Sequence, residues 1–167
     1  LDLEAPDLPF GLGSGAGTIY GTTGGVAEAV VRHCMPDKSR NTLRALEYSP
    51  LRGNESIREA TIPVGDREIK LAVVHGLINA QKLLKEIDEG TAYYDLIEVM
   101  TCPNGCVGGA GQPYGLKAKK QARSAGLYAT DRSAPFKRAE YNPGVTSILQ
   151  KLTHEQRHEL LHVSYQK

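Results

Sequence analysis

The chain has 167 residues, of which 40% are hydrophobic and 23% charged, an ordinary composition for one globular domain with its own core. Its 20 basic and 19 acidic residues leave a net charge of +1, which gives no reason to expect binding to nucleic acid or to a charged membrane surface. Three cysteines are too few for a disulfide framework, and no run approaches the roughly 20 apolar residues of a membrane span.

Glycine and proline crowd the start of the chain, so we expect an irregular loop over residues 1–22. A glycine pair then opens a predicted helix over residues 26–34, which Met35–Pro36 ends. Cys34 stands among apolar residues at the end of this helix, and we expect it to be a small packed thiol. Residues 37–58 are polar and weakly patterned, which indicates a surface excursion.

A β-hairpin is predicted in the middle of the chain. Residues 60–64 and 67–74 flank the turn-forming pair Gly65–Asp66, and Pro63 marks the first run as an edge strand. The segment Ile69–Val74 is apolar enough to be a buried strand.

A helix over residues 77–87 follows the hairpin, with Gly90 as its stop, and a further strand is predicted over residues 93–100. The apolar residues at helical spacing are Leu77, Ala80, Leu84 and Ile87. Strand, helix and strand over about thirty residues indicate a βαβ unit with parallel strands. Cys102 then lies just past the carboxyl end of a parallel strand, where open α/β sheets bind their ligands.

A short basic helix is predicted over residues 114–126, closed by Gly126 and followed by an extended connector over residues 127–144. Its cations are Lys117, Lys119, Lys120 and Arg123. We favour a solvated helix face for them over a docking site for an acidic electron carrier. Two closing helices follow, and Thr153 and Gln156 form a capping box at the start of the last one.

Residues 11–17, G-L-G-S-G-A-G, contain a nominal dinucleotide-binding pattern. Such a site needs a strand directly before the glycines, and residues 1–10 make a poor strand. No Gly-Lys-Ser/Thr sequence follows, so the requirement of a phosphate-binding loop is not met either. The sequence therefore disfavours a nucleotide site.

The zinc-protease pattern H-E-x-x-H occurs twice in overlap, at residues 154–158 and 158–162. A catalytic zinc site of this class needs a third protein ligand, which we do not expect in the few residues that follow. We favour an amphipathic helix that carries its histidines on one face. These are His154, His158 and His162. His75, at the end of a strand, is expected to be a hydrogen-bonded structural histidine.

Residues 100–113, M-T-C-P-N-G-C-V-G-G-A-G-Q-P, hold Cys102 and Cys106. Their spacing is neither that of a zinc knuckle nor that of a redox Cys-x-x-Cys pair. Pro103 and Gly105 predict a turn rather than a continuous helix. The glycines that follow offer amide groups without side chains, which together with thiolates suits an iron–sulfur cluster. A structural glycine turn is the alternative, and a cubane cluster takes four thiolates where only two are present.

This stretch resembles the third cluster-binding motif of iron-only (FeFe) hydrogenases, which reads roughly E-V-M-A-C-P-G-G-C-x-G-G-G-G-Q-P. Residues 13–32 and 73–84 resemble two further stretches of that family, S-G-A-G-x-I-F-G-x-T-G-G-V-x-E-A-x-x-R and V-A-H-G-L-x-N-A-x-K-L-L. Residues 141–143 and 158–165 resemble its C-terminal tail, which is rich in histidine at the same place.

The resemblance implies an α/β fold. Residues 1–113 would form parallel βαβ units of one lobe of the iron-only hydrogenase catalytic domain. Residues 114–167 would form a helical C-terminal tail that wraps around it, as the small subunit does in that family.

The resemblance also implies a cofactor and a reaction. Cys102 would be a terminal ligand of a 4Fe–4S cubane cluster, and Cys106 would bridge the cubane to a diiron subcluster with CO, cyanide and dithiolate ligands. The two parts together are the H-cluster, and Gly108 and Gly109 would bind beside it. The reaction of that family is the reversible reduction of protons to H2, which would make the protein an oxidoreductase.

Met100 would lie against the diiron unit, and Tyr20 and Gly21 would occupy the family's Phe-Gly pair beside it, so these three are the candidate catalytic residues. Two earlier motifs of the family, which carry the other two cysteine ligands, are absent. We expect a missing N-terminal catalytic segment or a partner subunit to supply them, and a ferredoxin-like carrier to exchange electrons. The expected compartment is the cytoplasm, with the periplasm as the alternative.

Four positions depart from the family pattern: Thr101 in place of Ala, Asn104 and Ala110 in place of Gly, and Tyr20 in place of Phe. Tyr20 puts a phenol where an apolar ring is usual, and a buried hydroxyl needs a partner. Such changes would mark a divergent, sensory or low-activity member. The alternative function is a hydrogenase-like iron–sulfur assembly or scaffold protein, which shares this C-terminal region and has no hydrogenase activity.

Overall fold

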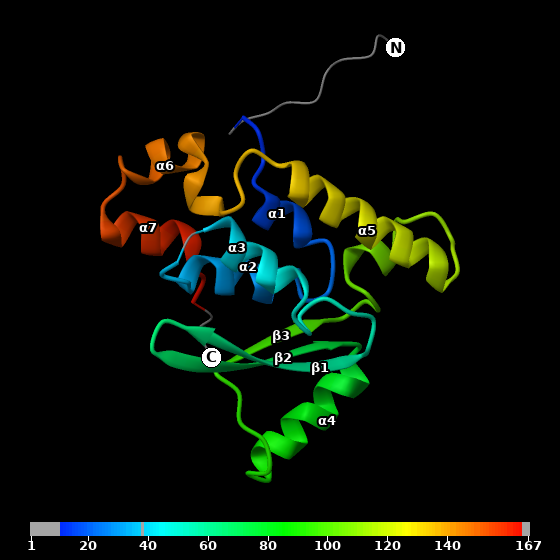
Figure 1. Ribbon diagram of the computed structural model, residues 1–167. Coiled ribbons are helices and arrows are strands. Elements are labelled where there is room, and N and C mark those ends of the chain that lie inside the picture. The colour runs from blue at the N-terminus through cyan, green and yellow to red at the C-terminus, as the bar shows by residue number, and fades with distance from the viewer. Residues whose placement is uncertain (1–10, 38, 165–167) are drawn as a thin grey trace.

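The computed structural model describes residues 11–37 and 39–164 (Figure 1). These residues form one sheet of strands β1 (Ile57–Val64), β2 (Arg67–His75) and β3 (Leu96–Met100), in the order β1-β2-β3. Strands β1 and β2 are antiparallel, whereas β2 and β3 are parallel. The mixed sheet and the helices around it confirm the predicted α/β class.

The β1–β2 hairpin is confirmed at the predicted turn. Val64 pairs with Arg67, and between them Gly65 has a φ of +63°, a conformation that glycine adopts without strain. Among the described residues β1 pairs only with β2, so Pro63 does lie on an edge strand, where a missing N–H is tolerated. Strand β2 is central, and its Leu71–Val74 segment is at most 1% exposed.

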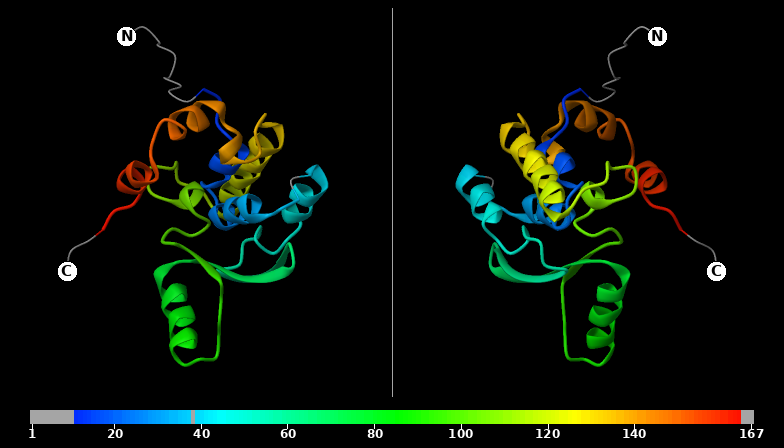
Figure 2. Two further views of the ribbon diagram at one scale, coloured as in Figure 1. Left: turned by 90° about the vertical axis from the view of Figure 1, so that its left-hand side faces the viewer. Right: turned by 90° about the vertical axis from the view of Figure 1, so that its right-hand side faces the viewer.

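Helix α4 (Leu77–Asp88) connects β2 to β3 and lies on the opposite side of the sheet from α1, α2, α3 and α5 (Figures 1 and 2). The predicted βαβ unit is therefore confirmed, with His75 opposite Met100 in parallel register. Strand β3 is shorter than predicted, because Asp95 forms a local turn before it. The Asp95 carboxylate accepts hydrogen bonds from the Lys70 N–H and the Tyr93 hydroxyl.

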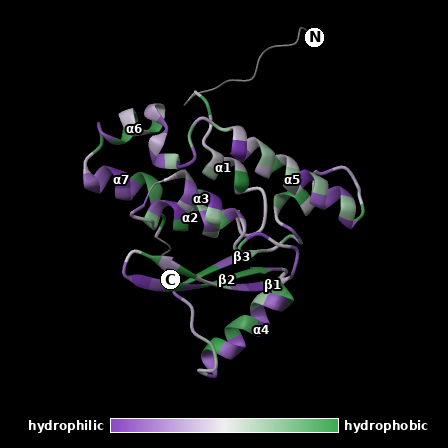
Figure 3. Cartoon of the chain, viewed as in Figure 1, coloured by the Kyte–Doolittle hydropathy of each residue, from purple (hydrophilic) through white to green (hydrophobic). Residues whose placement is uncertain are grey.

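The apolar set predicted for α4 is confirmed in part: Ala80 and Ile87 pack on the sheet side, together with Leu83, which the spacing omitted. Ala80 and Leu83 are buried against the sheet, whereas Leu77 and Leu84 are 62% and 55% exposed. Hydrophobic and hydrophilic residues follow one another along the whole helix, as Figure 3 shows. Because apolar residues stand on more than one side of α4, the spacing alone did not identify the buried side.

Helix α2 (Gly25–Cys34) is confirmed, but the irregular loop predicted before it is wrong in part, because α1 (Gly15–Ile19) is helical. The Ser14 hydroxyl accepts a hydrogen bond from the Gly17 N–H at 3.1 Å and caps α1. The N–H of the first residue of α1 donates to the carbonyl of Phe136 at 2.7 Å. This long-range contact, which local sequence cannot reveal, fixes the glycine-rich segment as a helix.

The surface excursion predicted for residues 37–58 is also wrong in part. It contains α3 (Arg40–Glu47), which Ser39 caps by accepting from the Thr42 N–H. Leu46 and Leu51 are only 2% and 1% exposed. Two well-placed leucines thus fold a largely polar segment onto the core.

The core has two parts, one on each side of the sheet. The larger part lies between the sheet and the α2–α3 layer, and it consists of Ala27, Val31, Met35, Leu46, Leu51, Ala60, Ile62, Leu71 and Val73. The smaller part lies under α4 and consists of Ala72, Val74, Ala80 and Leu83. The neighbours Leu71 to Val74 alternate between the two parts because successive strand residues face opposite sides.

The basic segment near residue 117 begins a much longer helix than predicted. Helix α5 extends over Lys117–Ser133, so Gly126 does not close it, and the extended connector predicted over residues 127–144 is wrong in part, because only residues 134–138 connect α5 to the next turn without helical structure. Part of that connector is the 3-10 turn Ala139–Tyr141. Glycine is tolerated inside a helix at a cost of up to about 1 kcal/mol, and here the residues beyond it are held by buried contacts.

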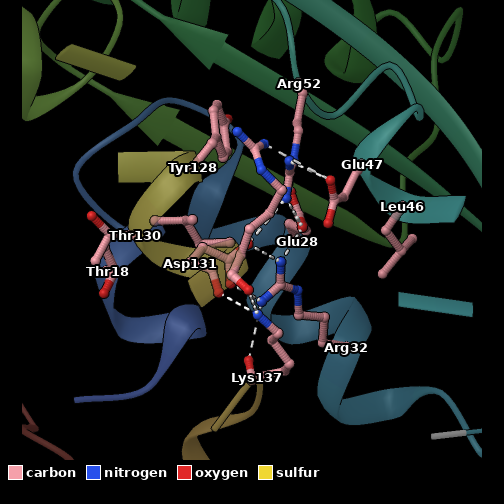
Figure 4. Close-up of polar contacts among 12 residues, drawn as sticks. Thr18, Glu28, Arg32, Leu46, Glu47, Arg52, Tyr128, Thr130, Asp131 and Lys137 are labelled. Atoms are coloured by element: carbon pink, nitrogen blue, oxygen red, sulfur yellow. Dashed lines mark hydrogen bonds and ion pairs between the residues drawn. The ribbon is translucent and has the colours of Figure 1, made fainter. Parts of the chain in front are cut away.

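A cluster of buried ion pairs fixes α5 to the rest of the fold (Figure 4). Arg32 donates to both carboxylate oxygens of Asp131, at 2.8 and 2.7 Å, and to Glu28 at 2.6 Å. Arg52 donates to Glu28 at 2.7 and 2.8 Å and lies 4.1 Å from the ring centre of Tyr128. We call Glu28, Arg32, Arg52 and Asp131 the ion-pair cluster. It joins the first half of the chain to the predicted C-terminal tail, whose division at residue 113 stays a prediction.

The pKa values of two members of the ion-pair cluster reflect their pairing. Burial acts to lower the pKa of Arg32, but its hydrogen bond to Asp131 and the charge of Glu28 outweigh burial and raise it. Burial likewise acts to raise the pKa of Asp131, but the hydrogen bonds and charge of Arg32 hold it below its usual value. Both groups are therefore charged at neutral pH.

The two predicted closing helices are α6 (Pro143–Leu149) and α7 (His154–Leu161), and the capping box of Thr153 and Gln156 is confirmed. The predicted histidine face of the last helix is confirmed for His158 and His162, whose rings stack, but every residue of α7 is exposed, so the helix has no buried apolar face in the described part of the chain. No helix in the described part of the chain is long and apolar enough to span a membrane.

Candidate metal centre

The two paired cysteines lie at the carboxyl end of the parallel strands, as predicted. Strand β3 ends at Met100, and Cys102 follows two residues later, half-buried, while Cys106 is exposed. Both are free thiols. Ligands of α/β sheets bind at this edge, so the position of the thiols is that of a ligand site.

The segment from Cys102 to Gly109, which we call the cysteine turn, is a turn followed by a short 3-10 helix rather than a continuous helix. The Gly105 N–H donates to the Cys102 carbonyl at 3.0 Å, and Asn104 and Gly105 both have positive φ, +68° and +85°. Asparagine is one of the few residues other than glycine that adopt this conformation readily. The departure from the family motif at Asn104 is therefore compatible with the same turn.

The cysteine turn lies directly against the turn that carries Tyr20 and Gly21. The Val107 N–H donates to the Gly21 carbonyl at 3.1 Å, and the Thr23 N–H donates to the Asn104 carbonyl at 3.2 Å. Two motifs that lie far apart in sequence are thus joined by backbone hydrogen bonds. Tyr20 is 48% exposed, so its phenol is not a buried hydroxyl in need of a partner.

Glycines make this contact and the space around the thiols possible. A Cβ at Gly105 would come 2.8 Å from the Thr23 nitrogen, and one at Gly109 would come 3.2 Å from the Cys102 sulfur. A Cβ at Gly108 would come 2.1 Å from the Pro103 carbonyl oxygen, well inside van der Waals contact. Absence of side chains therefore keeps the turn closed and leaves room beside one thiol.

The N–H groups of Gly108 and Gly109, which we expected to be available to a cluster, are already engaged in hydrogen bonds. They donate to the carbonyls of Gly105 and Cys106, at 3.0 and 3.1 Å, within the turn itself. The binding of a cofactor beside these two glycines stays a prediction, supported at Gly109, where the missing Cβ leaves the Cys102 sulfur uncovered.

Two buried charged residues that sequence reasoning missed support the site. The Glu98 carboxylate of β3 accepts hydrogen bonds from the N–H groups of Gly24 at 2.6 Å and Ala27 at 2.7 Å, and so fixes the start of α2 to the strand that leads to Met100. Arg58 donates to the Thr23 carbonyl at 2.8 Å, and burial lowers its pKa. The sequence signal that could have identified them is a charged residue at an inward-facing position of a strand, on β1 for Arg58 and on β3 for Glu98.

His75 is buried, 6% exposed, at the end of β2. Burial lowers its pKa and the charge of Arg58 lowers it further, although the backbone of Asn54 favours the charged form. Its Nε2 has no hydrogen-bond partner among the described residues, so the prediction of a hydrogen-bonded structural histidine holds for its burial but not for this nitrogen. In register it lies beside Met100, which is half-buried at the edge where the cysteine turn begins.

The structure also tests the predictions for Cys34 and for the C-terminal histidines. Cys34 is exposed rather than packed, because α2 directs Val31 and Met35 into the core and leaves its last residue outside. The rings of His158 and His162 stack with centroids 4.6 Å apart.

Over residues 11–37 and 39–164, no group of three or more His, Cys, Asp or Glu side chains is placed to hold a metal ion. The strand required by the dinucleotide pattern would fall on residues 1–10, outside the described part.

Comparison with known proteins agrees with this fold and these motifs. Residues 1–110 match the family described as iron only hydrogenase large subunit, C-terminal domain, and residues 117–167 match the iron hydrogenase small subunit. The chain therefore belongs to the iron-only hydrogenase family.

Three similar proteins illustrate the range of relatives. The NADP-reducing hydrogenase subunit HndD of Solidesulfovibrio fructosivorans is 38% identical over 96% of this chain and 28% of its own length. Cytosolic iron-sulfur assembly component 3 of Mus musculus is 33% identical over 87% of this chain and 31% of its own. The solved structure of a variant of [FeFe]-hydrogenase HydA1 from Chlamydomonas reinhardtii is 33% identical, with a TM-score of 0.68 over 97% of this chain and 50% of that one. The chain thus spans less than a third of these curated relatives.

Proposed function

We propose that this chain supplies two of the four thiolate ligands of the 4Fe–4S cubane in a hydrogenase that reversibly reduces protons to H2. Cys102 is the terminal ligand, and Cys106 also bridges to the diiron subcluster. The observation that carries the proposal is the pair of free thiols on a glycine-closed turn at the carboxyl end of a parallel strand, in a chain of the iron-only hydrogenase family. When bound, the H-cluster supplies the electron transfer and the proton reduction.

The residues of this chain bind and orient that group. Cys102 is half-buried and Cys106 is exposed, so both thiols are accessible to an iron–sulfur cluster. Met100 ends the strand that leads to the thiols, and Gly21 accepts a hydrogen bond from the cysteine turn, so these two residues and the neighbouring Tyr20 are the proposed lining of the cofactor site. Two thiolates are half of a cubane ligand set, so the other two come from protein outside these 167 residues.

The test uses the intact protein, or this chain produced together with its missing catalytic part, after maturation with the diiron cofactor. Infrared bands of iron-bound CO and cyanide and H2 turnover are expected for the unchanged protein. Cys102→Ser and Cys106→Ser should each abolish the bands and the turnover, whereas Cys34→Ser, which changes an exposed thiol away from the turn, should leave both unchanged. Normal iron and sulfide content without CO and cyanide bands would refute the hydrogenase assignment.

The second candidate function is an iron–sulfur assembly or scaffold protein. It is supported by the 33% identity to cytosolic iron-sulfur assembly component 3 over 87% of this chain. The same preparation distinguishes the two functions, because a scaffold would bind a 4Fe–4S cluster, visible by electron paramagnetic resonance after reduction, without CO or cyanide bands and without H2 turnover.

The partners follow from the same proposal. A ferredoxin-like carrier is the proposed electron partner, and the exposed Lys117 and Lys119 at the start of α5 are the alternative docking site to the solvated helix face that we favour. Contacts between opposite charges in water weaken with salt. Docking there would make electron transfer slow as ionic strength rises, and more weakly in a Lys117→Gln/Lys119→Gln variant, whereas a solvated face predicts the same salt dependence for both proteins. The cytoplasm stays the predicted compartment.

A further inference from the structure

Arg123 of helix α5 forms two hydrogen bonds to the backbone beside the cysteines. Its Nη1 donates to the Val107 carbonyl at 3.0 Å, and its Nη2 donates to the Pro113 carbonyl at 2.5 Å. Between these two carbonyls lies the glycine-rich segment 108–112, which has few side chains to hold it in place. One planar guanidinium therefore holds both ends of the least constrained part of the site.

Two further side chains of α5 contact the same site. A Cβ at Gly108 would come 3.3 Å from Cδ of Lys120, and a Cβ at Gly21 would come 2.7 Å from Cδ1 of Leu127. Positions 120, 123 or 124, and 127 recur every three to four residues, so they share one face of the helix. That face of α5 packs on both the cysteine turn and the turn before α2.

The far end of α5 is held independently. Asp131 is 1% exposed in the ion-pair cluster, and Tyr128 lies under Arg52, with its hydroxyl 3.1 Å from that of Thr22. A helix fixed at one end by buried charges can hold a flexible segment in place at the other.

We propose that Arg123 is a positioning residue: it holds segment 107–113 and thereby fixes how Cys102 and Cys106 are presented to their cofactor. This differs from the expectation that Arg123 belongs to a solvated cationic face, since its side chain is half-buried and both terminal nitrogens bond to carbonyls. The effect on the cofactor rests on the proposed function, whereas the effect on the segment does not.

The first test is hydrogen exchange of the amides of residues 108–112 in the intact protein without its cofactor. Arg123→Gln should speed this exchange about tenfold, as expected for loss of a hydrogen bond from a charged donor. Arg123→Lys, which can reach only one of the two carbonyls, should give an intermediate rate. Lys119→Gln is the matched control, because it removes the same charge from an exposed residue of the same helix, and it should leave the rate unchanged.

Exchange in residues 127–133 reports whether the variant is folded, since these amides belong to the part of α5 held by the ion-pair cluster. If Arg123→Gln speeds exchange in residues 108–112 and 127–133 alike, the two regions are compared again in the more conservative Arg123→Lys. Faster exchange confined to segment 108–112 supports the proposal. Unchanged exchange in that segment overturns it. An equal effect of Lys119→Gln would also overturn it, because the cause would then be charge alone.

The second test is the rate at which a chelator removes iron from the reconstituted protein, together with the line shape of its reduced cluster in electron paramagnetic resonance. Arg123→Gln should release iron several times faster and broaden the spectrum, and Arg123→Lys should partly restore both. If the unchanged protein binds no cluster while Arg123→Gln still loosens the segment, the proposed function fails and the positioning role stands. If clusters form but neither exchange nor iron release responds to Arg123, the positioning role fails and the proposed function stands.

Discussion

The ion-pair cluster and the cysteine turn both hold helix α2, but they differ in what completes them. The ion-pair cluster uses Glu28 and Arg32 of α2, and each of its charges contacts an opposite charge from the same chain. The cysteine turn contacts the residues just before α2 through backbone hydrogen bonds, and neither of its thiols forms a disulfide within residues 11–37 and 39–164. The first region is complete within these residues, whereas the proposed function has the second completed by an iron–sulfur cluster and by further protein.

This difference separates stability from function. Substitutions in the ion-pair cluster should change the free energy of unfolding and affect the site only through α2 and α5. Substitutions in the cysteine turn should change the presentation of the thiols at a smaller cost in stability. The predictions below test that separation, and the largest expected effect comes first.

Asp131→Ala should be the most damaging change. It leaves Arg32, 2% exposed, as a buried cation that has lost both hydrogen bonds from one partner. Breaking a buried pair by removing one partner typically costs about 3–5 kcal/mol. Urea unfolding of the intact protein should show this loss, and the exposed Asp88→Ala should show almost none. Equal midpoints for wild type and Asp131→Ala would mean that the ion-pair cluster does not support the fold.

The unfolding free energy lost in Asp131→Ala should also depend on pH. The pKa of Asp131 lies below its usual value when folded, so its pairing contributes stability that is present above the unfolded pKa of about 3.9. That contribution disappears as pH falls through the lower, folded pKa. The difference in unfolding free energy between wild type and Asp131→Ala should therefore be constant near neutral pH and shrink below about pH 4. A difference that grows on acidification would contradict this assignment.

Gly105→Ala should have the largest effect within the cysteine turn. Its φ of +85° disfavours any side chain, and the new Cβ would meet the Thr23 nitrogen at 2.8 Å and the Gly21 oxygen at 2.9 Å. We expect a loss of about 3 kcal/mol and separation of the two turns. Gly111→Ala is the control, since φ is +88° there but the space is open, so only the backbone strain of about 1 kcal/mol applies. Similar losses for both variants would show that the two turns do not press on each other.

Glu98→Gln should cost about 2 kcal/mol, because one of two charge-assisted hydrogen bonds to the start of α2 becomes a repulsive N–H to N–H contact. The exposed Glu68→Gln serves as its control. Hydrogen exchange of the Gly24 and Ala27 amides should rise in Glu98→Gln alone. Unchanged exchange at these two amides would remove Glu98 from the supports of the site.

Elements with strong local signals could be predicted from the sequence. The hairpin at Gly65, the βαβ unit and the capping box of Thr153 are set by turn chemistry, periodicity and neighbouring residues, and all three are confirmed. The place of the Cys pair at the end of β3 follows from the same unit. Local patterns are sufficient where periodicity or turn chemistry marks each element along its own length.

Elements held by distant partners could not be predicted. Helix α1 depends on the Phe136 carbonyl, and the last turns of α5 depend on the contact between Asp131 and Arg32, 99 residues apart. In the site, the family motif identified the cysteines, but Glu98 and Arg58 act through hydrogen bonds to turns far away in sequence. A sequence pattern shows that these residues are charged, and only the fold shows what they bind.

Gly126→Ala should produce the smallest effect and the opposite sign. Gly126 suggests a helix end in the sequence, yet it lies in the interior of α5, where a Cβ would meet nothing within 4 Å. Alanine is better than glycine inside a helix by about 0.5–1 kcal/mol, so urea unfolding should show a gain of that size. Gly90→Ala is the matched control, because the space is also open there but φ is +70°, so the same change should cost stability. A loss of stability in Gly126→Ala would mean that α5 ends near residue 126, and the tie from Asp131 to the cysteine turn through Arg123 would then be broken.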